Sequence, residues 1–178
     1  MSSVTTGLQK IEVRLRWDPS PVGESPRHLD IVAATYADDS PDDRPEYVVH
    51  YDSRSPDGTI NMDRHSETGM GFGFVEVMSL ELDRLAPSYT RVVVGVVIHQ
   101  DLTPRTFSDI ENAGVLVVEK YTDLLETDFT PVADSTCTTV VEFRRNDVGA
   151  WKLHELMRGF DCDASAFPTE MGGAHSAD

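Results

Sequence analysis

The sequence predicts an all-β protein, a two-sheet β-sandwich of about eight to ten short strands with little helix. Three observations lead to this prediction. Short runs of residues alternate between apolar and polar side chains or are continuously apolar and β-branched. Turn-forming residues recur about every dozen positions. An apolar period of about 3.6 residues never continues far enough to predict a long helix.

The first predicted strand covers residues 9–17, QKIEVRLRW, where apolar and charged residues alternate without a break. Such alternation is typical of a strand with one buried and one solvated face. The following residues, DPSPVGESPR, contain three prolines and a glycine, which end the strand.

The next two strands are predicted at residues 29–37 and 46–51, with an acidic, proline-containing loop between them. Residues 75–82, VEVMSLEL, alternate as a strand does, but the alternation breaks near Met78. A break of this kind predicts a β-bulge.

Residues 90–99, TRVVVGVVIH, are nearly all apolar and β-branched, so they are expected to form a central strand covered on both faces. Gly95 within this strand indicates a bend or a close approach of another part of the backbone.

Residues 103–113 are the best candidate for a short helical turn, and three strands are predicted after them. These strands are AGVLVVEK, TTVVEFRR and GAWKLHEL. The length of 178 residues fits one domain. We therefore predict a single sandwich domain over residues 1–160. Residues 161–178 are mostly small and polar, and we expect a poorly ordered C-terminal tail.

The chain is strongly acidic, with 15 Lys and Arg against 31 Asp and Glu and a formal net charge of −16. This balance argues against binding nucleic acid or an anionic membrane through a basic face. No apolar run has the length of a membrane span, and the N-terminus lacks the pattern of a signal peptide. We expect a cytoplasmic protein without membrane insertion, whose partner is an unidentified protein.

The sequence offers little support for catalysis. Cys137 and Cys162 have no CxxC spacing, and no GxSxG segment is present. The glycine-rich GMGFG lacks the GK[ST] ending of a phosphate-binding loop. We predict that the protein is not an enzyme.

Residues 55–77, SPDGTINMDRHSETGMGFGFVEV, have the features of an ion-binding loop, with a turn, a short strand and then several glycines. Glycines let backbone carbonyls turn towards a hard cation such as calcium. The spacing of acidic residues does not match an EF-hand, however. On composition alone, a solvated acidic loop and a cation site both stay open.

Eight segments occur in a characteristic order from near the N-terminus to about Phe160: GLQKIEVRLRWD, HLDIVAATY, YDSRSPDG, ETGMGFGFVEV, LELDRLAP, VVVGVVIHQ, TFSDIENAGVLVVE and GAWKLHEL. In this order they resemble the TerD family of tellurite-resistance and stress-response proteins. The resemblance implies a two-sheet β-sandwich that holds calcium in loops at one end.

The family's ligand-bearing pattern is only partly present in this chain. His28 stands at the first aspartate of the family's Asp-Leu-Asp-Ala-Ser strand, and His65 at the aspartate of its Asp-Asn pair. Phe72, Phe74 and Val75 replace acidic residues of a later run. Because the charge of the ligands tunes calcium affinity, we expect a degenerate calcium-binding loop with no tightly bound ion.

Asp30 and Glu76 are retained from the family pattern, and with His28 and His65 they form a candidate metal cluster. Imidazole and carboxylate together suit zinc or manganese rather than calcium. The other interpretation is that two surface histidines lie in a site that no longer binds metal. The remaining histidines His50, His99 and His154 are predicted to be core or edge residues rather than ligands.

Two functions follow from the resemblance and the residues. The first is a non-enzymatic, tellurium-resistance or stress-response protein of the TerD type that acts through protein contacts. The alternative is a metal-binding module with altered preference, for zinc or manganese through His28, Asp30, His65 and Glu76, or a residual weak calcium binder.

Overall fold

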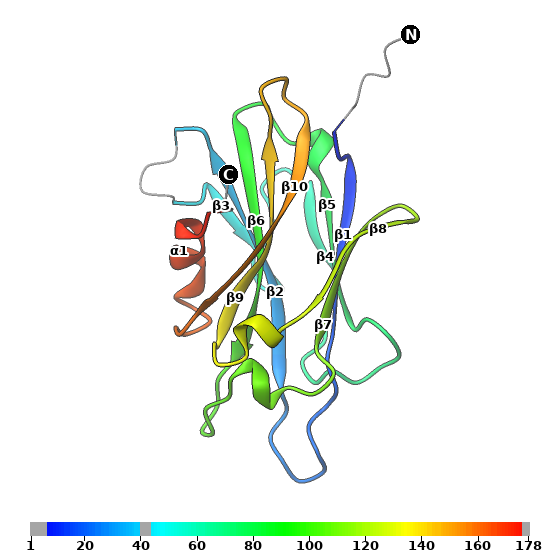
Figure 1. The fold of residues 1–178 in the computed structure, drawn as a ribbon, viewed down its shortest axis with the longest axis vertical. Helices are drawn as coiled ribbons and strands as arrows, with labels where there is room; N and C mark the ends of the chain where they lie inside the picture. The colour runs from blue at the N-terminus through cyan, green and yellow to red at the C-terminus, as the bar shows by residue number, and fades with distance from the viewer. Residues whose placement is uncertain (1–6, 40–43, 176–178) are drawn as a thin grey trace.

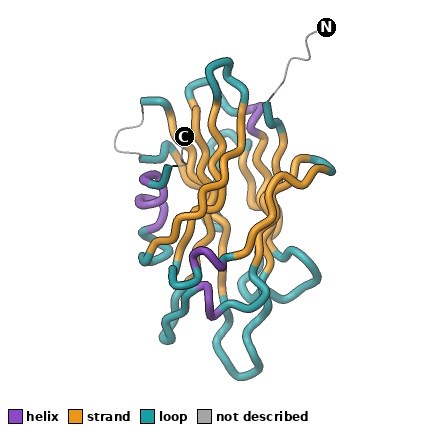
Figure 2. The backbone as a smooth tube through the Cα atoms, viewed as in Figure 1, coloured by secondary structure: helices purple, strands orange, loops and turns teal. Residues whose placement is uncertain are grey.

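The computed structural model describes residues 7–39 and 44–175. Within these residues, ten strands form two antiparallel five-stranded sheets that face each other, and helix is confined to short turns (Figures 1 and 2). The predicted β-sandwich is therefore confirmed.

The first sheet has the strand order β4-β5-β1-β7-β8. Its strands, in chain order, are β1 (Lys10–Arg16), β4 (Ile60–Arg64), β5 (Glu76–Glu81), β7 (Gly114–Glu119) and β8 (Thr122–Asp128). The second sheet has the order β10-β9-β6-β2-β3. Its strands are β2 (His28–Ala37), β3 (Tyr47–Val49), β6 (Tyr89–His99), β9 (Cys137–Arg145) and β10 (Trp151–Phe160).

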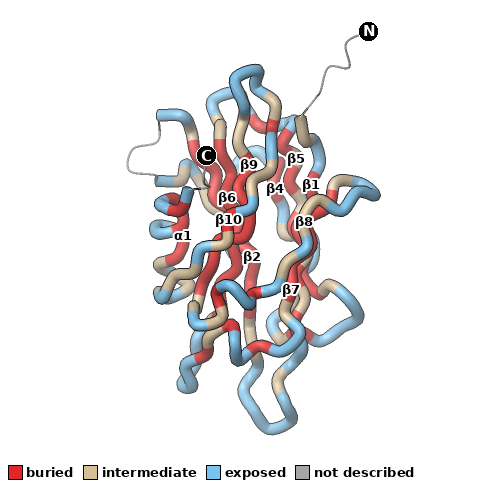
Figure 3. Tube along the Cα trace, in the orientation of Figure 1, coloured by how far each residue is buried: buried red, intermediate tan, exposed pale blue. Residues whose placement is uncertain are grey.

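The main hydrophobic core lies between the two sheets (Figure 3). Alternate residues of β1 supply one wall of this core, as the unbroken alternation of residues 9–17 predicts. The β-branched strand β6 is central in its sheet and is buried along most of its length. The largest side chains sealed in the core include Ile11, Leu15, Leu29, Ile31, Ile60, Met78, Leu80 and Phe143.

The bulge predicted near Met78 lies in the neighbouring strand instead. Pairing between β1 and β5 runs without a shift through Met78, whereas the register between β4 and β5 shifts between Met62 and Arg64. The alternation of residues 75–82 is irregular because Glu76 takes an inward position and Val77 is only half-buried. As a result, a carboxyl group enters the interior of the sandwich.

Between residues 103 and 128 lie a short 3-10 helix and an edge strand of the first sheet. The predicted helical turn is η3 (Phe107–Asp109), whose capping box joins Thr106 and Asp109. Strand β8, TDLLETD, was not predicted, because its side chains are mostly polar and it forms an edge of the sheet.

Residues 161–175, part of the segment predicted as a poorly ordered tail, pack against the second sheet. They contain α1 (Phe167–Glu170) and η5 (Met171–Gly173), which lie beside the second sheet (Figure 1). Phe167, Met171 and Ala174 are buried on the outer face of that sheet. These few apolar side chains anchor a segment whose average composition is polar. Residues 176–178 lie outside the described residues.

Because Gly95 has no side chain, the C-terminal segment can pack against β6 at this position. A Cβ atom at Gly95 would lie 2.7 Å from the ring of Phe167 and 2.5 Å from the carbonyl oxygen of Thr138. The close backbone approach predicted from the sequence is made by Thr138 of β9, and the ring of Phe167 packs at the same position. Arg91 holds the same segment, because its guanidinium donates to the carbonyls of Gly172 and Ala174 while pairing with buried Glu142.

In the described part of the chain, no helix has the length and apolar character needed to cross a membrane.

Candidate metal site

The candidate site lies where strand β2 begins. Strand β3 pairs with β2 only at Ala33–Thr35, so the preceding residues of β2 have an edge without a strand partner. On the other side β2 pairs with β6, and this register sets His28 opposite His99. Asp30 follows two positions later and is fully buried.

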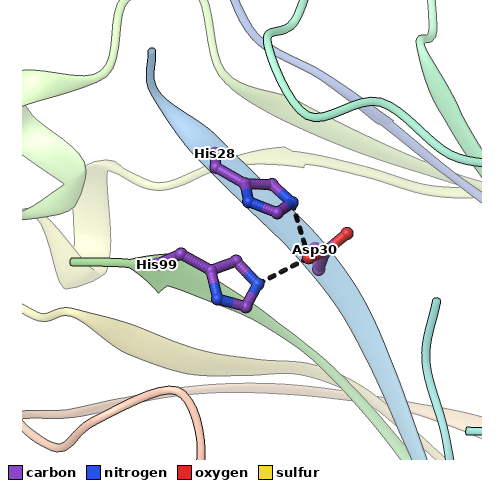
Figure 4. A group of neighbouring side chains, drawn as sticks. All are labelled: His28, Asp30 and His99. Carbon is purple, nitrogen blue, oxygen red and sulfur yellow. Dashed lines mark hydrogen bonds and ion pairs between the residues drawn. The ribbon is translucent and has the colours of Figure 1, made fainter. Parts of the chain in front are cut away.

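Three imidazole rings direct Nε2 atoms at the carboxylate of Asp30. The Nε2 atom of His99 lies 2.5 Å from Oδ2, and that of His28 lies 2.9 Å from the same oxygen (Figure 4). The second oxygen points away from these two rings (Figure 4) and lies 3.0 Å from Nε2 of His65. The carboxylate of Asp30 therefore contacts histidines from three separate chain segments.

Two of these atoms are close to polar neighbours without a well-aligned hydrogen bond. Nε2 of His28 and Oδ1 of Asp30 are both buried and lack a hydrogen-bond partner, despite the short distances. Buried polar atoms of this kind are rare in native proteins, because an unsatisfied group loses its hydration without compensation. A cation between the donors would satisfy both atoms.

The side chain of Glu76, which begins β5 of the first sheet, lies beside the same cluster. Its Oε2 atom accepts the backbone N–H of Ile31 at 2.6 Å, at the unpaired edge of β2. Its Oε1 atom lies 3.8 Å from Nε2 of His65 and accepts the backbone N–H of Ser66 at 3.4 Å. The carboxyl groups of Asp30 and Glu76 thus come together at the end of the sandwich where β2 begins.

The two buried carboxyl groups differ in charge. Burial and the adjacent Asp30 raise the pKa of Glu76 to about 10, so this group is protonated near neutral pH. Burial alone would raise the pKa of Asp30 too, but the contacts with His28 and His99 outweigh it and lower that pKa below its ordinary value. Asp30 therefore carries the negative charge that faces the imidazoles.

Tyr51 covers part of this cluster. Its ring stacks on His65 with a centroid distance of 4.8 Å and an interplanar angle of 9°, and it lies 5.9 Å from the ring of His28. The rings of His28 and His99 stack at 4.2 Å. Aromatic packing therefore fixes the orientation of the rings, which a metal site requires of its ligands.

The donor atoms form two overlapping groups that share Asp30: His28 with His99, and His65 with Glu76. Within each group the donors lie within 4.8 Å of one another. A tetrahedral zinc site with bonds of about 2.0–2.1 Å places its donors about 3.3 Å apart. Small shifts, which include a widening of the 2.5 and 2.9 Å contacts to Asp30, would fit the donors to an ion. Calcium instead prefers about six to eight oxygens, and among the described residues only two side-chain carboxyl groups are buried at the site.

The structure brings together all four residues predicted as the candidate cluster and adds His99, which the sequence analysis placed among the core or edge histidines. His28 and His99 occur at the ends of two predicted strands, and only the register of those strands makes them neighbours. His154 lies on β10, outside the cluster. Met70 and Phe72 in the glycine loop are 69% and 98% exposed, so Phe72 does not cover the site.

A family model described as the TerD domain matches residues 1–170. This chain belongs to the TerD family. Two solved structures resemble it closely across nearly their whole length. One is the crystal structure of SCO6318 from Streptomyces coelicolor A3(2), described as a homologue of the telluride resistance protein TerD. It is 59% identical, has a TM-score of 0.92, and the match covers 95% of this chain and 100% of that one.

Another similar solved structure is that of SAV2460, described as a protein of unknown function. It is 50% identical with a TM-score of 0.92, and the match covers 95% of this chain and 99% of that one. No curated protein matches the chain.

Proposed function

We propose that this TerD-family chain is a binding module for a divalent transition metal ion, zinc foremost, at the cluster around Asp30. The observation that carries the proposal is the convergence of three imidazole Nε2 atoms on one fully buried carboxylate. Neutral imidazole is a preferred ligand of zinc, and a carboxylate readily completes such a site.

Zinc is favoured over calcium by the kind of donor present. Calcium affinity rises with the number of charged oxygens, and the described residues bury two carboxyl groups here beside three imidazole nitrogens. Manganese accepts a mixed nitrogen and oxygen set but binds more weakly than zinc at a given site. The expected order of affinity is therefore zinc, then manganese, then calcium.

The proposal does not require catalysis. Burial, with a smaller effect from nearby Cys162, raises the pKa of the Cys137 thiol, so this group is a poor nucleophile. Both cysteines are free thiols, which suits a reducing compartment such as the cytoplasm. We infer that the module serves the tellurium-resistance or stress-response role of its family by holding an ion.

Calorimetric titration of the metal-free, full-length protein with zinc, manganese and calcium tests the proposal. We expect zinc to bind at micromolar or lower concentration, and the variants His99→Ala and His65→Ala to weaken it. His154→Ala is the matched control, because its imidazole lies outside the cluster, and it should leave zinc affinity unchanged. Micromolar calcium binding without a response to zinc would contradict the proposal.

Action through protein contacts is the second candidate, and the exposed apolar side chains of the glycine loop favour it. Phe72 is 98% exposed, and Met70 beside it is also exposed. A photo-cross-linking residue at position 72 should capture one specific protein in cells. The control is the same residue at position 22, because Val22 is an exposed apolar residue on a different loop. Equal capture from both positions would remove the support for this candidate.

A further inference from the structure

A cavity of about 410 Å³ adjoins the candidate metal site on the outer face of the second sheet. Asp30 and His99 form one end of it, and the C-terminal segment forms the opposite side. This volume is within the usual range for small-molecule sites, about 300–1,000 Å³. The apolar part of the lining consists of Val32, Val97, Ala164 and Pro168.

The polar part of the lining supplies hydrogen-bond donors without a positive charge. The Nδ1 atom of His50 accepts the backbone N–H of Asp52 at 3.1 Å. A neutral ring with this arrangement carries its proton on Nε2, which is then a donor. Tyr51 and Ser165 add hydroxyl groups. Since no Lys or Arg lines the cavity among the residues that the structure describes, a bound cation would be the group that attracts an anionic ligand there.

The two groups of donors around Asp30 meet this cavity differently. Two donors of the first group, Asp30 and His99, belong to its lining, although His28 does not; of the second group only the shared Asp30 belongs to it. An ion held by His28, Asp30 and His99 would have three protein ligands. A zinc ion with three protein ligands keeps a further coordination position for an external molecule.

We propose that the cavity binds a small carboxylate with an apolar body, whose carboxylate coordinates the ion held by His28, Asp30 and His99. This inference rests on the proposed metal binding. An ion held by His28, Asp30 and His99 would place positive charge beside the cavity, and a carboxylate can occupy the coordination position that three protein ligands leave open. The apolar body then lies against Val32 and Val97, where it displaces water from apolar surface.

Titration of the zinc-loaded, full-length protein with benzoate tests this inference, with benzyl alcohol as an uncharged ligand of similar shape. We expect benzoate to bind the zinc-loaded protein and not the metal-free protein in the presence of a chelator. Benzyl alcohol should bind at least about tenfold more weakly, because it lacks the coordinating carboxylate. Benzoate binding of equal strength with and without zinc would overturn the inference.

The variant Ala164→Leu places extra side-chain volume at the cavity wall. It should abolish benzoate binding while leaving zinc affinity unchanged. Ala166→Leu is the matched control, since Ala166 is in the same segment but does not line the cavity. Retained benzoate binding in Ala164→Leu would overturn the assignment to this cavity.

A second measurement does not depend on the folding of any variant. Cobalt(II) in place of zinc should produce strong paramagnetic relaxation of the benzoate protons, because the carboxylate contacts the ion. Absence of this relaxation in a complex that binds benzoate would overturn the inference. If no transition ion binds at all, both this inference and the proposed function fail. If zinc binds and benzoate does not, only this inference fails.

Discussion

His99 and Asp30 are 69 residues apart in the chain, yet Nε2 of His99 lies 2.5 Å from Oδ2 of Asp30. The pairing of β2 with β6 produces this contact, since it brings the end of one strand beside the start of the other. Asp30 is therefore the residue on which the candidate site depends most.

Asp30→Asn should weaken zinc binding by more than about 100-fold, because it removes the charge shared by both groups of donors while keeping the side-chain size. Competition against a zinc-sensitive dye measures this change. Asp52→Asn is the control, because Asp52 is exposed and outside the candidate cluster. A similar loss of affinity in both variants would contradict the central role of Asp30.

The raised pKa of Glu76 predicts that the stability of the metal-free protein depends on pH. An unfolded chain releases this proton near the ordinary pKa of 4.5, whereas the folded protein keeps it up to about 10. Between these values the folded state binds more protons, so its stability falls as the pH rises.

Glu76→Gln should reduce that slope, since the amide resembles the protonated carboxyl group but does not titrate. Urea unfolding at about pH 6 and about pH 9 with a chelator present measures the effect. An unchanged slope in Glu76→Gln would show that Glu76 is ionised in the folded protein.

Gly95→Val should lower the free energy of unfolding by about 1–3 kcal/mol or more, because the added side chain overlaps Phe167 and the backbone at Thr138. Phe167→Ala should cost about 3–5 kcal/mol by leaving a cavity. Because the two residues are in contact, the double variant should cost less than the sum. Gly173→Ala is the control, as its Cβ would meet no atom within 4 Å.

Arg91→Ala should destabilise the protein by up to about 3–5 kcal/mol, because it removes the closer of two guanidinium groups that pair with buried Glu142 and leaves the more distant Arg144, 3.4 Å from the other carboxylate oxygen. The same change removes two hydrogen bonds to the C-terminal segment. Limited proteolysis should then cut that segment faster. Replacing both partners, as Arg91→Met with Glu142→Leu, should cost less than Arg91→Ala alone.

Phe72→Ser should change the free energy of unfolding by less than about 0.5 kcal/mol, since the side chain is almost fully exposed. Thermal unfolding measures this directly. A clear loss of stability would mean that the Phe72 ring packs against the protein in solution.

The sequence predicted the fold well because strand alternation reports burial directly. Strand β1 alternates throughout, and β6 is continuously apolar, so both were recognised. Strand β8 was missed because a polar edge strand has little apolar pattern. In β5 the polar residue Glu76 occupies a buried, inward position. A pattern that assigns polar residues to the surface therefore places an irregularity in this strand.

The candidate site was predicted in part. His28, Asp30, His65 and Glu76 were named because the family pattern supplies their positions. His99 lies outside that pattern, and the pairing of β2 with β6 brings it to Asp30. The packing of the C-terminal segment could not be predicted either, since it depends on the contact of Phe167 with Gly95 in strand β6.

The donors around Asp30 come from both halves of the sandwich. His28, Asp30 and His99 belong to the second sheet, while His65 follows β4 and Glu76 begins β5 in the first. An ion shared among them would cross-link the two sheets at the end where one edge of β2 has no strand partner. Separation of the sheets would then have to wait for the ion to leave, so metal supply would set how long each molecule survives before it unfolds.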